Sequence, residues 1–120
     1  MLEVRELHGS ANPGANEARH WIGNRVEDVY GAGIGRVEDV LVDATGTPTW
    51  LVVREGRFNT HVAAIPFDGD LGSPGHVWVP VSKEAVKASP EIPESGAFTA
   101  ELESSLREHY AAHGSPQRAR

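Results

Sequence analysis

The chain has 120 residues, which suffice for one domain with a hydrophobic core and are too few for two. Hydrophobic residues make up 39% and charged residues 23%, a balance typical of soluble globular domains that excludes wholesale disorder. The formal net charge is −6, with 17 Asp and Glu against 11 Lys and Arg. The average surface field therefore repels phosphate backbones and disfavours general nucleic-acid binding. Cysteine is absent, which excludes disulfides, thiolate nucleophiles and Cys-ligated zinc.

The sequence predicts neither a membrane span nor a secretory signal. The longest apolar runs, 50–53 and 62–65, are far shorter than the roughly 20 residues that cross a bilayer. Glu3, Arg5 and Glu6 occupy the region in which a signal peptide needs a basic start and then an apolar block. We therefore expect a cytoplasmic protein without a transmembrane segment.

The first 20 residues are expected to form a flexible tail, because segment 9–16 is polar and rich in Gly, Asn and Pro. A β-rich body should follow over 21–92. All but one of the valines lie between Val26 and Val86, and Gly-rich breaks interrupt this stretch at short intervals. The linkers are too short for crossovers, so most neighbouring strands should pair antiparallel. Strands are predicted at 25–29, 34–42, 49–54, 61–66 and 77–81.

The motif Arg-Val-Glu-Asp-Val occurs twice, at 25–29 and 36–40. A repeat architecture needs at least three copies, so this echo favours two facing strands of one hairpin with similar environments. The glycines of the connecting segment 31–35 are also typical of a phosphate-binding loop, but such a loop is followed by a helix. A strand is expected here, so we predict a hairpin turn that needs positive φ.

Two helices are predicted after the strands. Ser82 can cap a short helix over 83–87. Residues 93–120 should then form a linker, a helix that Thr99 caps and Gly114 ends, and a short disordered end. This helix is amphipathic and marginal alone, so it should pack on the sheet or on another subunit. Its apolar stripe consists of Leu102, Leu106, Tyr110 and His113.

The ordered set of motifs over 21–92 resembles a PRC-barrel domain, and the C-terminal Leu-Arg-Glu-His-Tyr resembles the ending of small stand-alone bacterial members. The resemblance implies a mainly β fold, a small, strongly bent, mostly antiparallel β-barrel with a short helix after the last strand and a C-terminal amphipathic helix. It also implies a role in docking onto proteins. The matching segments are Trp21-Ile22-Gly23, Gly35-Arg36-Val37-Glu38-Asp39-Val40-Leu41-Val42-Asp43, Gly46-Thr47-Pro48-Thr49-Trp50-Leu51-Val52-Val53, Ala64-Ile65-Pro66-Phe67 and Val79-Pro80-Val81-Ser82.

Three patterns resemble reactive or metal-binding sites and are interpreted as structural. His109 and His113 share a helical face, but two ligands are too few for a metal. Segment 68–70, Asp-Gly-Asp, lacks the spacing of a calcium loop. Asp28 and Asp39 would more readily bond to turns and backbone than act as an acid–base pair. We therefore predict no catalytic residue, no cofactor and no metal.

The function that we predict is that of a non-enzymatic adaptor with an unidentified protein partner, including self-association as a homodimer. An accessory role in RNA or ribosome maturation, or a metal- or small-molecule-binding regulator, remains open as an alternative. Any Trp that stays exposed would mark a docking surface. The candidate partner contacts are Arg57, Phe58, His61, Leu102, Leu106 and Tyr110.

Overall fold

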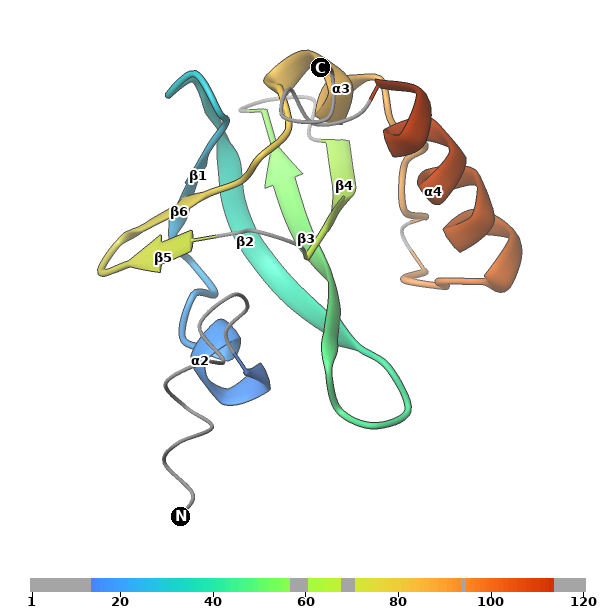
Figure 1. Ribbon diagram of the computed structural model, residues 1–120, viewed down its shortest axis with the longest axis horizontal. Helices are drawn as coiled ribbons and strands as arrows, with labels where there is room; N and C mark the ends of the chain where they lie inside the picture. Colours follow the sequence, from blue (N-terminus) through green and yellow to red (C-terminus); the bar gives the residue numbers. More distant parts are fainter. Residues whose placement is uncertain (1–13, 57–60, 68–70, 94, 114–120) are drawn as a thin grey trace.

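A computed structural model of the chain describes residues 14–56, 61–67, 71–93 and 95–113 (Figure 1). Six strands form one mixed sheet, and three helices lie around it. The elements are α2 (Ala15–Arg19), β1 (Arg25–Glu27), β2 (Gly33–Val42), β3 (Pro48–Glu55), β4 (His61–Pro66), β5 (Leu71–Ser73), β6 (His76–Trp78), α3 (Lys83–Lys87) and α4 (Ala100–His113). No helix in this described part is long and apolar enough to cross a bilayer.

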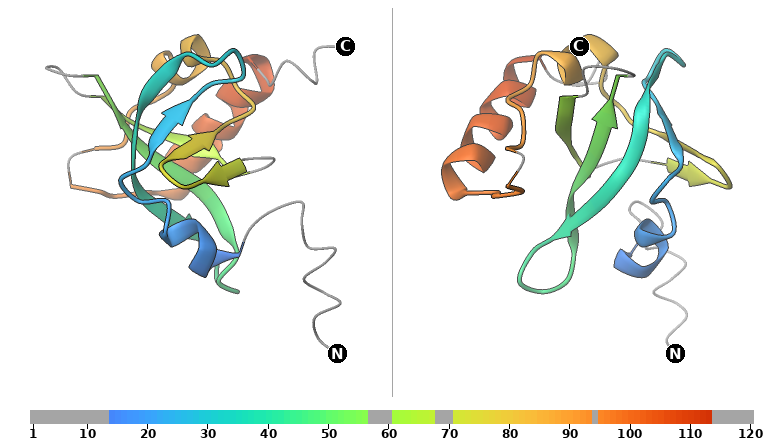
Figure 2. Two further views of the ribbon diagram at one scale, coloured as in Figure 1. Left: turned by 90° about the vertical axis from the view of Figure 1, so that its left-hand side faces the viewer. Right: turned by 180° about the vertical axis from the view of Figure 1, so that it is seen from behind.

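The sheet has the strand order β4-β3-β2-β1-β6-β5. All pairings are antiparallel except that of β1 with β6, which confirms the expected preference for antiparallel neighbours. The two views of Figure 2 show how far β2 and β3 curve. Within the described strands, β4 and β5 do not pair with each other, so the sheet stays open and the predicted closed barrel is not confirmed.

Side chains pack between the two ends of the open sheet. The Trp21 ring stacks on Phe67, which follows β4, with ring centroids 5.7 Å apart. Trp21 also lies so close to Gly72 of β5 that a Cβ at that position would overlap the indole. The stacked pair Trp21 and Phe67 therefore lies between the ends of the sheet, β4 and β5, which a closed barrel would join by hydrogen bonds.

Four boundaries differ from the predictions by more than one residue. Strand β1 ends at Glu27, two residues before the predicted end. Residues 15–19 form α2 and bury Ala18 completely, so the expected flexible tail is wrong for this part of 1–20, whereas 1–13 lie outside the described residues. Strand β5 forms where only a linker was expected. Strand β6 ends at Trp78, before the predicted residue 81, because Pro80 has no N–H to donate to a ladder.

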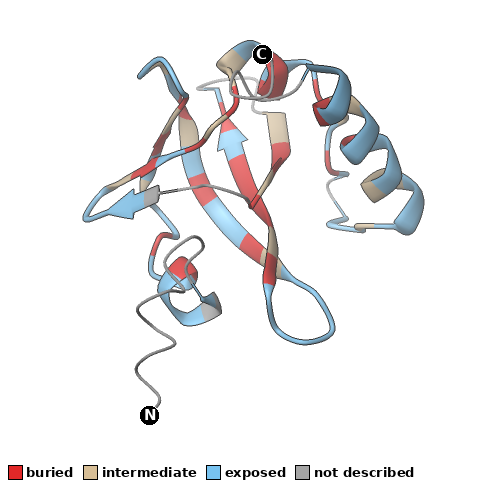
Figure 3. Cartoon of the chain, viewed as in Figure 1, coloured by how far each residue is buried: buried red, intermediate tan, exposed pale blue. Residues whose placement is uncertain are grey.

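Buried residues recur between exposed ones along β2, whereas β3 is buried over most of its length, as Figure 3 shows. Successive side chains of a strand point to opposite faces, so the core includes both faces of β3. Helix α4 packs against this core through Leu106 and Tyr110, which are both buried. The Tyr110 hydroxyl donates a hydrogen bond of 2.9 Å to the backbone carbonyl of Ala64. The indole N–H of Trp50 donates to the Glu103 carboxylate at 2.9 Å. The helix predicted to dock in cis or on another subunit therefore docks in cis.

Both predicted caps are confirmed. The Ser82 hydroxyl accepts a hydrogen bond from the Ala85 N–H at 3.1 Å at the start of α3. The Thr99 hydroxyl accepts one from the Leu102 N–H at 3.0 Å at the start of α4. Each cap satisfies a backbone donor that has no partner inside the first helical turn.

Candidate binding face

Asp28 fixes the position of α3 relative to the β1–β2 hairpin. Its side chain is 2% exposed, and one carboxylate oxygen accepts the backbone N–H groups of Tyr30 and Ala32, both at 2.8 Å. The other oxygen accepts the backbone N–H of Lys83 at 2.8 Å, at the first residue of α3. A carboxylate at a helix N-terminus is favoured by the helix dipole. One buried side chain thus ties together two walls of the groove described below.

A row of arginines crosses three neighbouring strands on the solvent-exposed face of the sheet. Arg25 of β1 lies directly opposite Arg36 of β2, and Arg36 lies directly opposite Arg54 of β3. All three residues are exposed. His76 of β6 extends the row on the other side of Arg25. Like charges directly opposite one another destabilise a sheet, so this arrangement calls for a reason other than stability.

Local contacts hold two of these three arginines in place. Arg36 donates through Nη1 to the backbone carbonyl of Gly23 at 3.0 Å. The Arg54 Nε donates to the Glu38 carboxylate at 2.6 Å. The guanidinium of Arg25 lies over Gly33, 3.5 Å from where a Cβ would stand. Hydrogen bonds therefore hold Arg36 and Arg54, whereas the side chain of Arg25 makes no hydrogen bond or ion pair within the described part of the chain.

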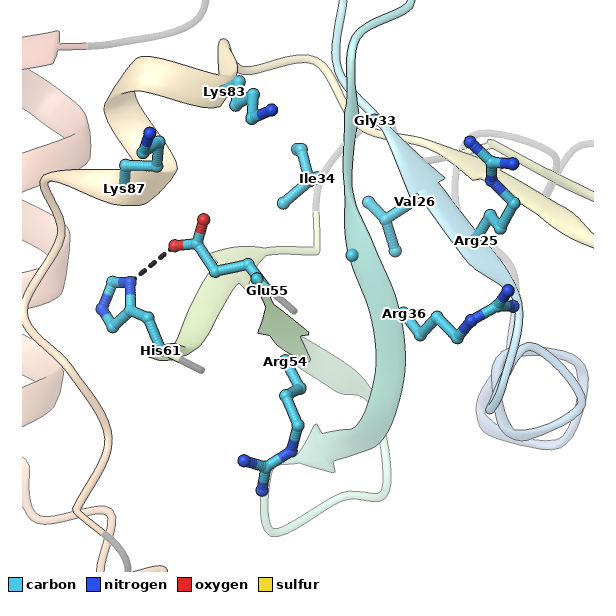
Figure 4. Close-up of a pocket in the computed structure, with 12 residues that line it drawn as sticks. Arg25, Val26, Gly33, Ile34, Arg36, Arg54, Glu55, His61, Lys83 and Lys87 are labelled. Atoms are coloured by element: carbon cyan, nitrogen blue, oxygen red, sulfur yellow. Dashed lines mark hydrogen bonds and ion pairs between the residues drawn. The ribbon is translucent and has the colours of Figure 1, made fainter. Parts of the chain in front are cut away.

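The row borders a groove of about 930 Å³, which we call the basic groove (Figure 4). Lys83 and Lys87 of α3 lie at one end of this view, and Arg25 and Arg36 lie on the other side of β2. The only carboxylate among its lining residues is Glu55, which accepts from His61 Nδ1 at 2.5 Å. The lining consists of Arg25, Val26, Gly33, Ile34, Gly35, Arg36, Arg54, Glu55, Gly56, His61, Lys83 and Lys87.

An aromatic and apolar surface lies next to the row. Trp78 is 39% exposed and stacks on His76, with ring centroids 5.7 Å apart. Trp78 is paired with Glu27, and Val29 and Tyr30 follow in the turn after β1. Val29 is 41% exposed and Tyr30, at the hairpin turn, is 75% exposed. We call Val29, Tyr30 and Trp78 the aromatic patch.

The structure distributes the predicted contact residues over three environments. His61 lines the basic groove. Leu106 and Tyr110 are buried in the core, and Leu102 is half-buried against it, so α4 uses this stripe for its own docking. Arg57 and Phe58 lie outside the described residues. Of the described members of the predicted set, only His61 therefore lines the basic groove. It pairs with Glu55, the neighbour of Arg54 on β3, so its side chain lies on the opposite face of the sheet from the arginine row.

The other predicted patterns have structural roles where they are described. Asp28 bonds to turn and backbone groups as expected, and Asp39 accepts the N–H of its neighbour Val40 at 2.8 Å. The turn before β2 has Gly31 at φ +85°, which confirms the hairpin interpretation. Segment 68–70 lies outside the described residues.

The paired histidines of α4 also have a structural contact. His109 Nε2 lies 2.6 Å from the Ala85 carbonyl oxygen of α3, within hydrogen-bond distance. Its ring centroid is 4.5 Å from that of His113. Among the described residues, no three His, Asp or Glu side chains are grouped so as to hold a metal ion.

Sequence reasoning missed the arginine row, although one signal pointed towards it. The echoed motif places Arg25 and Arg36 at corresponding positions, and the hairpin register does pair them. Arg54 and the two lysines join them only through the β2–β3 register and the placement of α3, which no local pattern specifies.

The chain was compared with known proteins. No curated protein matches it. The family model described as PRC-barrel domain matches residues 13–90, which is more than half of the chain and includes α2, which the predicted boundary of 21–92 left out. The matched region contains all six strands, the hairpin turn and α3. The chain belongs to the PRC-barrel domain family.

Proposed function

We propose that this chain is a non-enzymatic adaptor that binds another protein through the aromatic patch. The observation that carries the proposal is the exposure of Trp78. Trp21 and Trp50 are buried, whereas Trp78 is 39% exposed and is paired with Glu27, which precedes the turn that carries the exposed Val29 and Tyr30. Tryptophan and tyrosine are enriched among the residues that dominate binding energy at protein interfaces, and exposed apolar patches commonly mark such interfaces.

The ionisable groups that are most buried support a role without catalysis, because each has a structural partner. Asp28 accepts three backbone N–H groups. Glu55 is paired with His61, an arrangement that orients an imidazole in hydrolases. Within the described lining of the groove, however, no side chain supplies a hydroxyl or thiol nucleophile to that pair.

An RNA-associated role is the second candidate, and the stacked His76–Trp78 pair beside three arginines favours it. Bases stack on such rings in proteins that bind single strands. Carboxylates lie within the same face, however. Glu27 is 3.7 Å from His76, and Glu38 is bound to Arg54. These acids interrupt the arginine row, so the continuous positive surface that a phosphate backbone would follow is short, and the protein-binding role is favoured.

The test is quantitative affinity purification from the cells that make the protein, followed by mass spectrometry with and without ribonuclease. A Trp78→Ala/Tyr30→Ser variant should lose proteins that the unmodified bait retains after ribonuclease treatment. The matched control is Ile22→Ser, which removes an apolar side chain that is 47% exposed outside the patch. Equal recovery with both variants would reject the aromatic patch. Loss of all proteins after ribonuclease treatment would favour the RNA role.

Self-association remains part of the proposal and concerns the sheet, because α4 already uses its apolar stripe in cis. The exposed face of β1 and β6 is the surface that a second copy would cover. Light scattering should then report a dimer that the Trp78→Ala/Tyr30→Ser variant weakens. A monomer at high protein concentration would reject this part.

A further inference from the structure

We propose that the basic groove binds an extended acidic segment of the protein partner, so that clustered Asp and Glu side chains meet the arginines and lysines. The inference rests on the proposed adaptor function and adds the chemistry of the partner. It uses a surface next to the aromatic patch, because His76 and Trp78 share β6, and Arg25 lies on β1, which leads into the turn with Val29.

The first argument is the contrast in charge. The protein carries a net charge of −6 and has only 11 Lys and Arg. Five of these cations line the basic groove, and Glu55 is the one carboxylate among its described lining residues. One of the five, Arg54, is bound to Glu38. The rest of the surface is correspondingly more acidic than the net charge indicates. A groove of opposite sign on an acidic protein attracts anionic groups locally and orients their approach.

The second argument is that several of these cations lack partners of their own. Within the part of the chain that is described, the side chains of Lys83 and Lys87 make no hydrogen bond or ion pair. They are four residues apart and therefore lie on one face of α3. The side chain of Arg25 likewise makes no hydrogen bond or ion pair within the described part, and Arg25 lies directly opposite a like charge, Arg36.

The third argument is the spacing of the charges, which fits an extended peptide better than a single small anion. Neighbouring strands lie about 4.8 Å apart, and alternate side chains of an extended peptide lie about 7 Å apart. The cations come from β1, β2, β3 and α3 and do not converge on one point. A row of this kind can meet several carboxylates, each as a charge-assisted hydrogen bond.

A long polyanion fits less well than a short acidic segment. The phosphates of RNA continue past the groove onto a surface that is acidic on average and would be repelled there. A peptide, by contrast, can carry acidic residues only where it lies in the groove and neutral residues beyond it. Within the groove, the carboxylate of Glu55 is paired with the imidazole of His61. An acidic side chain that enters the groove would therefore approach this pair and not a lone carboxylate.

The experiment measures binding of a fluorescently labelled peptide of about ten residues with alternating Glu and Ser, by anisotropy at low and physiological salt. The intact chain should bind it, and the same peptide with Gln for Glu should not bind. Lys83→Gln/Lys87→Gln and Arg25→Gln should each weaken binding by roughly two- to fivefold per cation removed. The matched control is Arg19→Gln, because Arg19 is an exposed cation on α2 outside the groove.

Three outcomes would overturn the inference. They are the absence of binding by the Glu peptide, an equal loss in Arg19→Gln, and tighter binding of an oligouridylate of about ten nucleotides than of the peptide. Inorganic phosphate that displaces the peptide at matched ionic strength would instead assign the groove to single anions. If the peptide does not bind but capture that depends on Trp78 persists, the groove inference fails and the adaptor function stands. Loss of both rejects both.

Discussion

Replacing Asp28 with alanine should strongly destabilise this protein and separate α3 from the β1–β2 hairpin. The change removes a carboxylate that accepts three backbone N–H groups, from Tyr30, Ala32 and Lys83, each at 2.8 Å. Two of these bonds close the hairpin turn, and the third crosses 55 residues of sequence to the start of α3. No other side chain among the described residues forms this link.

The expected cost follows from the number and the burial of these bonds. A hydrogen bond to a charged group contributes about 1.5–3 kcal/mol, and a buried N–H left without a partner costs a similar amount. Water can reach the turn donors in part, so we expect a total loss of about 3–5 kcal/mol. Domains of this kind unfold with about 5–15 kcal/mol, so a large fraction of the stability would be lost.

Urea unfolding followed by circular dichroism measures this loss. With a slope of about 1–3 kcal/mol per M, the midpoint should fall by roughly 2 M while the slope stays constant. Asp28→Asn should be intermediate, because the amide keeps one acceptor oxygen and turns an NH₂ group towards the Lys83 N–H.

Asp43→Ala is the matched control. Asp43 also accepts three hydrogen bonds, from the Thr45 N–H and hydroxyl and from the Thr47 N–H, but within one exposed turn. Its removal should cost clearly less than that of Asp28. The reasoning about burial is refuted if the two alanine variants unfold at the same urea concentration, or if Asp28→Ala loses less than about 1 kcal/mol.

Three further predictions concern the docking of α4. Leu106→Ala should cost about 2–5 kcal/mol in urea unfolding, because Leu106 is fully buried, and a near-neutral result would show that α4 is not part of the core. The Trp50 indole N–H, together with Arg107, holds the pKa of Glu103 below its ordinary value. The contribution of the Glu103 carboxylate to stability should therefore fade as pH drops below about 4.3. The difference in Tm between the unmodified protein and Glu103→Gln should shrink over the same pH range. Burial raises the pKa of Tyr110, so the contribution of its neutral hydroxyl to stability is present below a pH of about 10 and is lost as the pH rises further. In a Tyr30→Phe variant, Tyr110 is the remaining tyrosine, and its phenolate absorbance should appear only as the protein unfolds.

Local features of the chain were predicted correctly because short-range physics specifies them. Strand β4 begins and ends at the predicted residues, β2 begins one residue earlier than predicted, and β3 extends one residue further at each end. The caps of α3 and α4 and the positive φ of Gly31 likewise depend on neighbours within four residues. The predictions missed β5 and α2 because their local sequence preference is weak. Strand β5 is only three residues long, and α2 is stabilised by the burial of Ala18 in the folded protein.

The candidate site was only partly accessible from sequence. The echoed motif predicted that Arg25 and Arg36 occupy similar positions, and the hairpin pairs them. Nothing local indicated that Arg54, Lys83 and Lys87 would join them, or that Trp78 alone of the three tryptophans would stay exposed. The predicted contacts Leu106 and Tyr110 proved to be core residues, because an apolar helical stripe has the same pattern whether it packs in cis or on a partner.

Sequence patterns thus specified the type and approximate extent of most elements, since periodicity, turn residues and caps act over a few residues. The parallel pairing of β1 with β6, the open sheet and the presence of five cations along one groove depend instead on contacts between residues that are far apart in the chain. Those contacts are selected by the total burial and hydrogen bonding of the folded state. No window of the sequence carries that information on its own.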